Sequence, residues 1–193
     1  LDEKGNFIVI NLITKDTSPD FIPDYCDVTR FQTVVYICGS SEREYWKPKF
    51  CVQGFRYVKL ENWPEEVKPE HFQAIAVYSD MDVTAKFSCS SSDVEQLVKN
   101  TLWSMKGNFL DVPTDCPTRE RAPWLGDAQL LFDTECYLID FTAFFQKWMR
   151  DVFDDQAPDR KVYNIVPRGA AHGGMNEFVE GSSGWTDAGI LIP

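Results

Sequence analysis

SSSDVEQLVKNTLWSMKG, residues 90–107, is the stretch at which the character of this chain changes. After the serines, apolar residues recur at helical spacing: Val94, Leu97, Val98, Leu102 and Met105. Ser92 and Glu95 have the spacing of a capping box, and Gly107 is a typical residue at a helix end. The stretch therefore predicts an amphipathic helix that begins at Ser92 and ends at Gly107.

The residues before this stretch indicate strands. Short β-rich runs, separated by Pro, Gly, Ser and Asp, occupy residues 7–12, 33–38, 55–60, 73–78 and 84–89. Several of them alternate polar and apolar residues, as in FRYVKL at 55–60. This pattern is typical of an antiparallel β-sandwich, so we predict such a domain over residues 1–90.

The residues after this stretch indicate helices. One is predicted from about Asp127, and another is predicted to be capped by Asp140. The second carries an apolar stripe: Phe141, Phe144, Phe145, Trp148, Met149 and Val152. A third is predicted over 185–192, after a flexible Gly- and Ala-rich loop at 168–183. We expect these helices to be too few to close a core, which leaves the stripe partly exposed and indicates a piece of a longer protein.

Composition excludes several classes of protein. Of the 193 residues, 44% are apolar and 14% aromatic, which is enough to fill a packed core and excludes global disorder. The net charge of -11 argues against a nucleic-acid partner, and no apolar run is long enough for a membrane span. Two histidines, no CxxC pair and no glycine-rich phosphate loop predict neither a metal nor a cofactor. The six cysteines are expected to be buried free thiols.

The densest polar segment is DVPTDCPTRERAPWLGD, residues 111–127. It places carboxylates beside arginines and a tryptophan, and three prolines stiffen it. Carboxylates bind sugar hydroxyls, an indole packs on a sugar ring, and a Glu among other carboxylates can act as a general acid. On composition alone, a connecting loop with surface salt bridges is the favoured interpretation.

A family resemblance bears on this choice. NFLDVPTDCPTRER at 108–121, continuing through Trp124 to GDAQ at 126–129, resembles the signature of bacterial α-L-rhamnosidases of glycoside hydrolase family 78. Residues 53–58, 144–151 and 184–188 resemble further segments of that family. The resemblance implies a mixed β-then-α fold: the end of a β-sandwich domain, then the first helices of a truncated (α/α)6 barrel over 91–193.

The resemblance also implies an activity, namely hydrolysis of terminal α-L-rhamnosyl residues with inversion. Glu120 matches the general acid. Six further residues match or adjoin positions that bind the sugar: Asp115, Arg119, Trp124, Asp127, Trp185 and Asp187. A core position for Trp185 and a helix N-cap role for Asp187 stay open as alternatives.

Two departures limit the resemblance. Ala122-Pro123 stands where the family commonly has Leu-Gly, which leaves the sugar preference open. The family's general base lies downstream of this segment, so we expect the 193 residues alone to be inactive. The alternatives are a related helical-barrel glycosidase for another terminal sugar and a non-catalytic carbohydrate-binding relative. The expected partner is a rhamnose-containing glycoside or polysaccharide, while a cytoplasmic, periplasmic or secreted location and the oligomeric state stay open.

Overall fold

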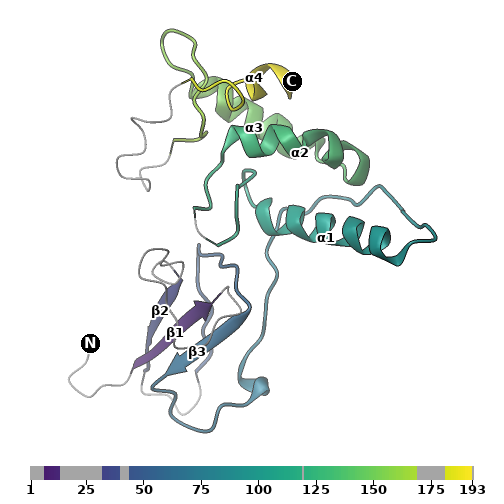
Figure 1. The fold of residues 1–193 in the computed structure, drawn as a ribbon. Coiled ribbons are helices and arrows are strands. Elements are labelled where there is room, and N and C mark those ends of the chain that lie inside the picture. The colour runs from purple at the N-terminus through teal and green to yellow at the C-terminus, as the bar shows by residue number, and fades with distance from the viewer. Residues whose placement is uncertain (1–6, 14–31, 40–43, 119, 169–180, 193) are drawn as a thin grey trace. The chain divides into compact units, whose positions relative to one another are not determined.

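The computed structural model describes residues 7–13, 32–39, 44–118, 120–168 and 181–192. These residues form two compact units. The first contains the residues up to Ala76 together with Pro117 and Thr118, and the second begins at Val77. Figure 1 shows the strands in the first unit and the long helices in the second.

The first unit is built on a three-stranded antiparallel sheet. Its strands are β1 (Phe7–Ile13), β2 (Thr33–Ile37) and β3 (Tyr57–Glu61), in the order β2-β1-β3. Val9 lies opposite Val35 on one side and Glu61 on the other. Three of the five predicted strands are thereby confirmed, with ends that differ by one or two residues. A 3-10 helix, η1 (Pro69–His71), follows the sheet.

The loop residues Pro117 and Thr118, which group with the first unit, contact the segment that precedes β3. The backbone N–H of Gly54 donates a hydrogen bond of 2.9 Å to the carbonyl oxygen of Pro117. A Cβ atom on residue 54 would lie 2.8 Å from Cγ2 of Thr118, which explains why the position holds a glycine.

The two remaining predicted strands, 73–78 and 84–89, are wrong. Neither segment has a strand in the described part of the chain. Near the second segment, Val83 instead forms an isolated bridge with Ile139, and the N–H of Thr84 donates to the carbonyl of Leu138 at 3.0 Å. A β-rich pattern reports side-chain preference, and it produces a strand only where a partner strand is present.

The helix predicted at the change of pattern is α1 (Ser92–Asn108). Its N-cap is Ser91, one residue before the predicted start, and no side chain caps it there. The predicted capping box is therefore wrong. Glu95 instead accepts a hydrogen bond of 3.1 Å from the backbone N–H of Cys89, which leads into the helix.

The other helices are α2 (Leu125–Leu138), α3 (Thr142–Asp154) and the short α4 (Ala188–Leu191). Asp140 does cap the start of α3, since its Oδ1 accepts the N–H of Thr142 at 3.1 Å, and this bond lowers the pKa of its carboxyl. Across the described residues, no helix combines the length and the apolar character that a membrane crossing needs.

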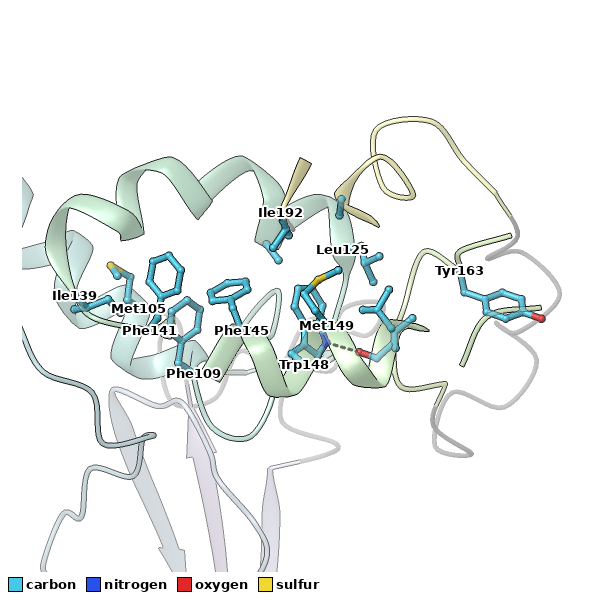
Figure 2. Close-up of a cluster of buried hydrophobic side chains, with 14 residues drawn as sticks. Met105, Phe109, Leu125, Ile139, Phe141, Phe145, Trp148, Met149, Tyr163 and Ile192 are labelled. Carbon is cyan, nitrogen blue, oxygen red and sulfur yellow. Dashed lines mark hydrogen bonds between the residues drawn. The ribbon is translucent and has the colours of Figure 1, made fainter. Parts of the chain in front are cut away.

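The apolar stripe of α3 forms the centre of a buried cluster (Figure 2). Trp148 is 0% exposed, and its indole N–H donates a bond of 2.8 Å to the carbonyl of Val166. The rings of Phe141 and Phe145 meet edge to face with centroids 4.6 Å apart. The expectation that Trp148, Phe144 and Phe145 are partly exposed holds for Phe144, which is half-buried. It is wrong for Trp148 and Phe145, because residues of α2, α4 and the 163–166 segment belong to the same cluster.

The cysteines also differ from expectation. All five that the structure describes are free thiols, as expected, but none is buried. Cys51, Cys89 and Cys136 are exposed, while Cys38 and Cys116 are half-buried. Cys26 lies outside the described residues.

Candidate functional site

The 111–127 loop connects α1 to α2, and two hydrogen bonds fold it back on itself. The N–H of Asp115 donates to the carbonyl of Ala122 at 3.0 Å. The N–H of Ala122 donates to Oδ1 of Asp115 at 2.9 Å. This reciprocal pair closes the loop around Glu120, so Asp115 has a structural role in addition to any contact with a ligand.

The end of the loop is held by a segment from beyond α3. Trp124 pairs with Ile165 in an isolated antiparallel bridge. On either side, the N–H of Leu125 donates to the carbonyl of Asn164 at 2.8 Å, and the N–H of Val166 donates to the carbonyl of Pro123 at 3.1 Å. The buried Trp148 in turn binds Val166, so the core of the helical unit supports the position of Trp124.

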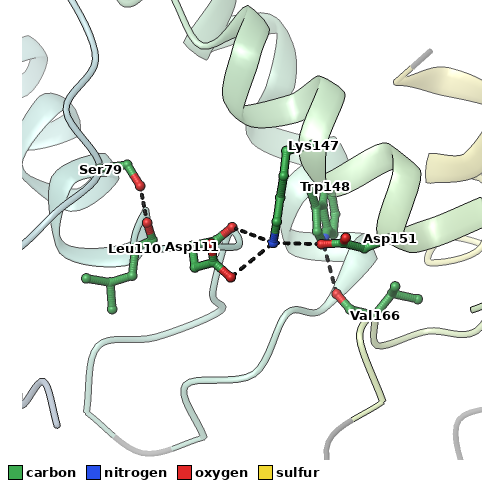
Figure 3. Close-up of polar contacts among 7 residues, drawn as sticks. All are labelled: Ser79, Leu110, Asp111, Lys147, Trp148, Asp151 and Val166. Atoms are coloured by element: carbon green, nitrogen blue, oxygen red, sulfur yellow. Dashed lines mark hydrogen bonds and ion pairs between the residues drawn. The ribbon is translucent and has the colours of Figure 1, made fainter. Parts of the chain in front are cut away.

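The start of the loop is held by the polar face of α3 (Figure 3). The Nζ of Lys147 lies 3.0 Å from Oδ2 of Asp111 and 2.8 Å from Oδ2 of Asp151. Burial acts to lower the pKa of Lys147, but the hydrogen bonds to Asp151 and Asp111 outweigh it, so the pKa is raised. The hydroxyl of Ser79 also donates to the carbonyl of Leu110.

Three carboxylates of this region interact electrostatically. The pKa of Asp127 is raised by burial first and by the negative charge of Asp115 second, with a smaller contribution from Glu120. A hydrogen bond to its own backbone opposes the shift. The charges of Asp115 and Glu120 therefore lie close enough to disfavour the ionisation of Asp127, and ligands that donate hydrogen bonds to its carboxylate would offset this.

Glu120 is held through both its side chain and its backbone. The indole N–H of Trp124 donates to its Oε2 at 2.9 Å. Its own N–H donates to Sγ of Cys116 at 3.1 Å. The next residue, Arg121, has a φ of 51°, in the left-handed region that a residue with a Cβ adopts at a cost. A strained backbone beside a polar side chain is typical of a functional site.

Trp185 contacts Trp124 and the start of α2. The two indoles meet edge to face, with ring centroids 6.4 Å apart and an interplanar angle of 63°. A Cβ on Gly126 would lie 2.8 Å from the Trp185 ring, so only glycine lets the ring approach. Trp185 is 39% exposed, which disagrees with a core position.

Asp187 lies two residues further on and shapes the turn that presents Trp185. Its Oδ2 accepts the N–H of Gly184 at 3.0 Å. It is the N-cap residue of α4, as the alternative interpretation held, but its side chain makes no capping bond to that helix. Arg119, the remaining predicted binding residue, lies outside the described residues.

Asn164 is a supporting residue that the sequence reasoning missed. It is buried, and its side chain bonds twice to Ser182, which precedes Trp185. Its carbonyl accepts the N–H of Leu125, so one residue links the end of the loop to the segment of the second indole. The sequence feature that could have identified it is a single amide side chain within the apolar run YNIV at 163–166.

Within the described ranges, no group of three or more His, Cys, Asp or Glu residues has a geometry that could hold a metal ion. The predicted site residues Asp115, Glu120, Trp124, Asp127, Trp185 and Asp187 all belong to the second unit. The structure thus combines a small antiparallel sheet, a set of helices and a loop on which carboxylates and tryptophans gather.

Family models identify the class of protein. The model described as the bacterial alpha-L-rhamnosidase 6 hairpin glycosidase domain matches residues 82–193. The model described as the bacterial alpha-L-rhamnosidase concanavalin-like domain matches residues 22–78. The chain belongs to the bacterial alpha-L-rhamnosidase family, which confirms the resemblance seen in the sequence.

Curated relatives agree with this assignment. An alpha-L-rhamnosidase of Formosa agariphila is 35% identical over 164 residues, covering 83% of this chain and 17% of that protein. An alpha-L-rhamnosidase of Streptomyces avermitilis is 31% identical over 162 residues, covering 83% of this chain and 15% of that protein. The chain therefore spans about a sixth of the length of the curated relatives it matches.

Solved structures agree as well. The Streptomyces avermitilis alpha-L-rhamnosidase complexed with L-rhamnose superposes with a TM-score of 0.81 at 26% identity, covering 98% of this chain and 18% of that one. The alpha-L-rhamnosidase of Dictyoglumus thermophilum superposes with a TM-score of 0.82 at 26% identity, covering 97% and 21% of the two chains. The described fold is thus that of a segment of these enzymes.

Proposed function

We propose that this chain contributes the general acid and part of the sugar subsite of a glycoside hydrolase that removes terminal α-L-rhamnosyl residues with inversion. The observation that carries the proposal is the environment of Glu120. It shares its loop with Asp115 and Asp127, whose charges interact, and with Trp124, which binds its carboxyl group. Family membership and the rhamnose complex of the Streptomyces relative support the choice of sugar.

In the proposed reaction, Glu120 gives its proton to the glycosidic oxygen. The bonding pair of the C1–O bond moves to that oxygen as the aglycone leaves. A water molecule attacks C1 from the opposite face of the ring. In inverting enzymes a second carboxylate, roughly 6.5–9.5 Å from the acid, takes a proton from this water. We assign that base to the part of the full-length protein outside this chain.

The other residues of the site are assigned to binding. Asp115 uses Oδ1 for the Ala122 N–H, so we assign its Oδ2 to a sugar hydroxyl. Burial first, and the negative charges of Asp115 and Glu120 after it, raise the pKa of Asp127, and hydrogen bonds from sugar hydroxyls would stabilise its charged form. Trp124 and Trp185 offer aromatic faces to the apolar side of the ring and the 6-methyl group, with Asp187 behind Trp185. Arg119 is assigned to donate hydrogen bonds to the sugar.

We extend the proposal to the domains of the whole protein. Residues 1–90 would be the end of a β-sandwich domain, and residues 91–193 the opening helices of an (α/α)6 barrel. The concanavalin-like and 6 hairpin family models support this division.

Glu120→Gln in the full-length protein tests the proposed acid. We expect kcat/KM on an alkyl α-L-rhamnoside to fall by about 10²–10⁴-fold, because its leaving group needs a proton. The fall on a nitrophenyl rhamnoside should be much smaller, because that leaving group departs without one. Glu66→Gln, at an exposed position of the first unit, is the matched control and should leave both rates unchanged. An unchanged rate on the alkyl rhamnoside would remove Glu120 from the mechanism.

The choice of sugar has its own measurement, since Pro123 departs from the family pattern. A panel of nitrophenyl glycosides should show the α-L-rhamnoside as the fastest substrate. Faster hydrolysis of another terminal sugar would favour a related glycosidase, and binding without turnover of any substrate would favour a carbohydrate-binding relative.

A further inference from the structure

The carboxyl group of Glu120 has two oxygen atoms, and the indole N–H of Trp124 donates to one of them, Oε2, at 2.9 Å. We propose that Trp124 is a positioning residue for the general acid: its N–H holds Oε2 as the carbonyl oxygen and so keeps the transferable proton on Oε1. This inference rests on the proposed function of Glu120 and assigns Trp124 a role distinct from packing against the sugar.

The chemistry of the two groups determines which oxygen carries the proton. An indole N–H is a donor and never an acceptor. A neutral carboxylic acid has one hydroxyl oxygen and one carbonyl oxygen, of which the carbonyl oxygen is the better acceptor. A donor fixed at Oε2 therefore favours the form in which Oε2 is the carbonyl and Oε1 bears hydrogen.

Trp124 is itself held firmly enough to serve as this donor. Its backbone pairs with Ile165, and the neighbouring N–H of Leu125 binds the carbonyl of Asn164. Its ring meets Trp185 edge to face. A group that orients a catalytic side chain acts best when it is itself held in place. Backbone pairing holds the main chain of Trp124, and the contact with Trp185 restricts its ring.

The same bond favours the products of proton transfer. When the Oε1 proton moves to the glycosidic oxygen, Glu120 is left as a carboxylate and the C1–O bonding pair goes to the departing oxygen. The hydrogen bond from Trp124 then has a charged acceptor, and such bonds are roughly twice as strong as neutral ones. The stabilisation is therefore greater after transfer than before it, which is the condition for accelerating the step.

Trp124→Phe in the full-length protein separates this role from sugar packing, because phenylalanine keeps an aromatic face and lacks the N–H. We expect kcat/KM to fall about 10–100-fold further on an alkyl rhamnoside than on a nitrophenyl rhamnoside. Trp185→Phe is the matched control, since Trp185 contacts the same ring and makes no bond to Glu120. It should lower the two rates by the same factor.

The double variant Glu120→Gln, Trp124→Phe tests whether the effect passes through Glu120. In the Glu120→Gln background, adding Trp124→Phe should lower both rates by one common factor, with no further dependence on the leaving group. A leaving-group effect that persists in this background would overturn the inference.

The outcomes also distinguish this inference from the proposed function. If Glu120→Gln shows the leaving-group effect while Trp124→Phe lowers both rates equally, Glu120 is the acid and the positioning role of Trp124 is wrong. If Glu120→Gln shows no leaving-group effect, the proposed function itself fails.

Discussion

α1 and α3 carry the same kind of apolar stripe in the sequence, and the structure places the two stripes in different surroundings. On α3, Trp148 is 0% exposed at the centre of the buried cluster. On α1, the stripe residues Leu97 and Val94 are 63% and 42% exposed, and Met105 is the one residue of the described helix that is fully buried. Trp103, which lies beside the stripe, is 62% exposed. Helical periodicity thus predicts a helix correctly in both cases and does not predict what covers it.

The cover of α3 comes from segments distant in the sequence. Tyr163 and Val166 follow it, α2 precedes it, and Ala188 and Ile192 arrive from α4. The sequence of the stripe itself does not predict which segments pack against it. The burial of an apolar stripe can therefore be predicted only when the segments that pack against it are considered as well, including short irregular segments.

Replacement of one tryptophan on each helix gives the largest expected contrast. Trp148→Ala should lower the free energy of unfolding of this unit by about 3–5 kcal/mol, because it leaves a cavity and removes the donor to Val166. Trp103→Ala should change it by no more than about 0.5 kcal/mol, as exposed substitutions usually do. Denaturant unfolding followed by far-UV circular dichroism would measure both. Equal losses would mean that α1 is covered as fully as α3.

Glu135 of α2 is a buried acidic residue that makes the stability of the helical unit depend on pH. It is 1% exposed, and neither carboxyl oxygen has a hydrogen-bond partner among the described residues. Burial raises its pKa from 4.5 to about 8. Because the folded pKa lies above the unfolded one, the folded state binds the extra proton. The contribution of this proton to the free energy of unfolding is therefore fully present below pH 4.5 and is lost as the pH rises through about 8.

Glu135→Met should remove this pH dependence. We expect a gain in the free energy of unfolding of about 2–4 kcal/mol at pH 8 and little change near pH 4, where the carboxyl is neutral. Asp133→Asn, at an exposed position of the same helix, is the matched control and should leave the pH slope unchanged. Urea unfolding at several pH values would measure the slope. A slope that survives in Glu135→Met would show that another group causes it.

The polar face of α3 should give the smallest effect. Lys147 joins Asp111 to Asp151, yet its side chain is 45% exposed to solvent. Lys147→Met should therefore cost less than about 1 kcal/mol, and the loss should vanish at about 1 M salt. Arg150→Met is the matched control, because Arg150 is an exposed cation of α3 outside this network. A loss that persists at high salt would show that the Lys147 stem, and not its charge, holds the loop.

Much of the fold could be predicted from the sequence because its signals are local. The stripes gave α1 and α3, and Asp140 gave the start of α3. The segments 73–78 and 84–89 failed as strands because pairing depends on a partner that the pattern does not contain. The burial of Trp148 was missed for a similar reason, since its cover lies 18 residues away at Val166.

The contacts among the candidate site residues could not be predicted from the sequence. The motif brought Asp115, Glu120, Trp124 and Asp127 onto one loop, and the charges of its three carboxylates do interact. The bond from the Trp124 indole to Glu120 depends on χ angles and loop closure, which no spacing encodes. The role of Asn164 depends on the segment after α3 packing against the start of α2, where the N–H of Leu125 donates to the Asn164 carbonyl.

The pairing of Trp124 with Ile165 also sets the order in which the protein can assemble during synthesis. Ile165 leaves the ribosome about 40 residues after Trp124, and at roughly 5–20 residues per second the delay is about 2–8 seconds. α1 can form within that interval, because a helix needs only local contacts. The loop around Glu120 still lacks the backbone partners of Pro123 and Leu125 at that stage. Nascent chains that end between Trp124 and Ile165 would therefore contain both residues of the Glu120–Trp124 pair without the support that fixes it.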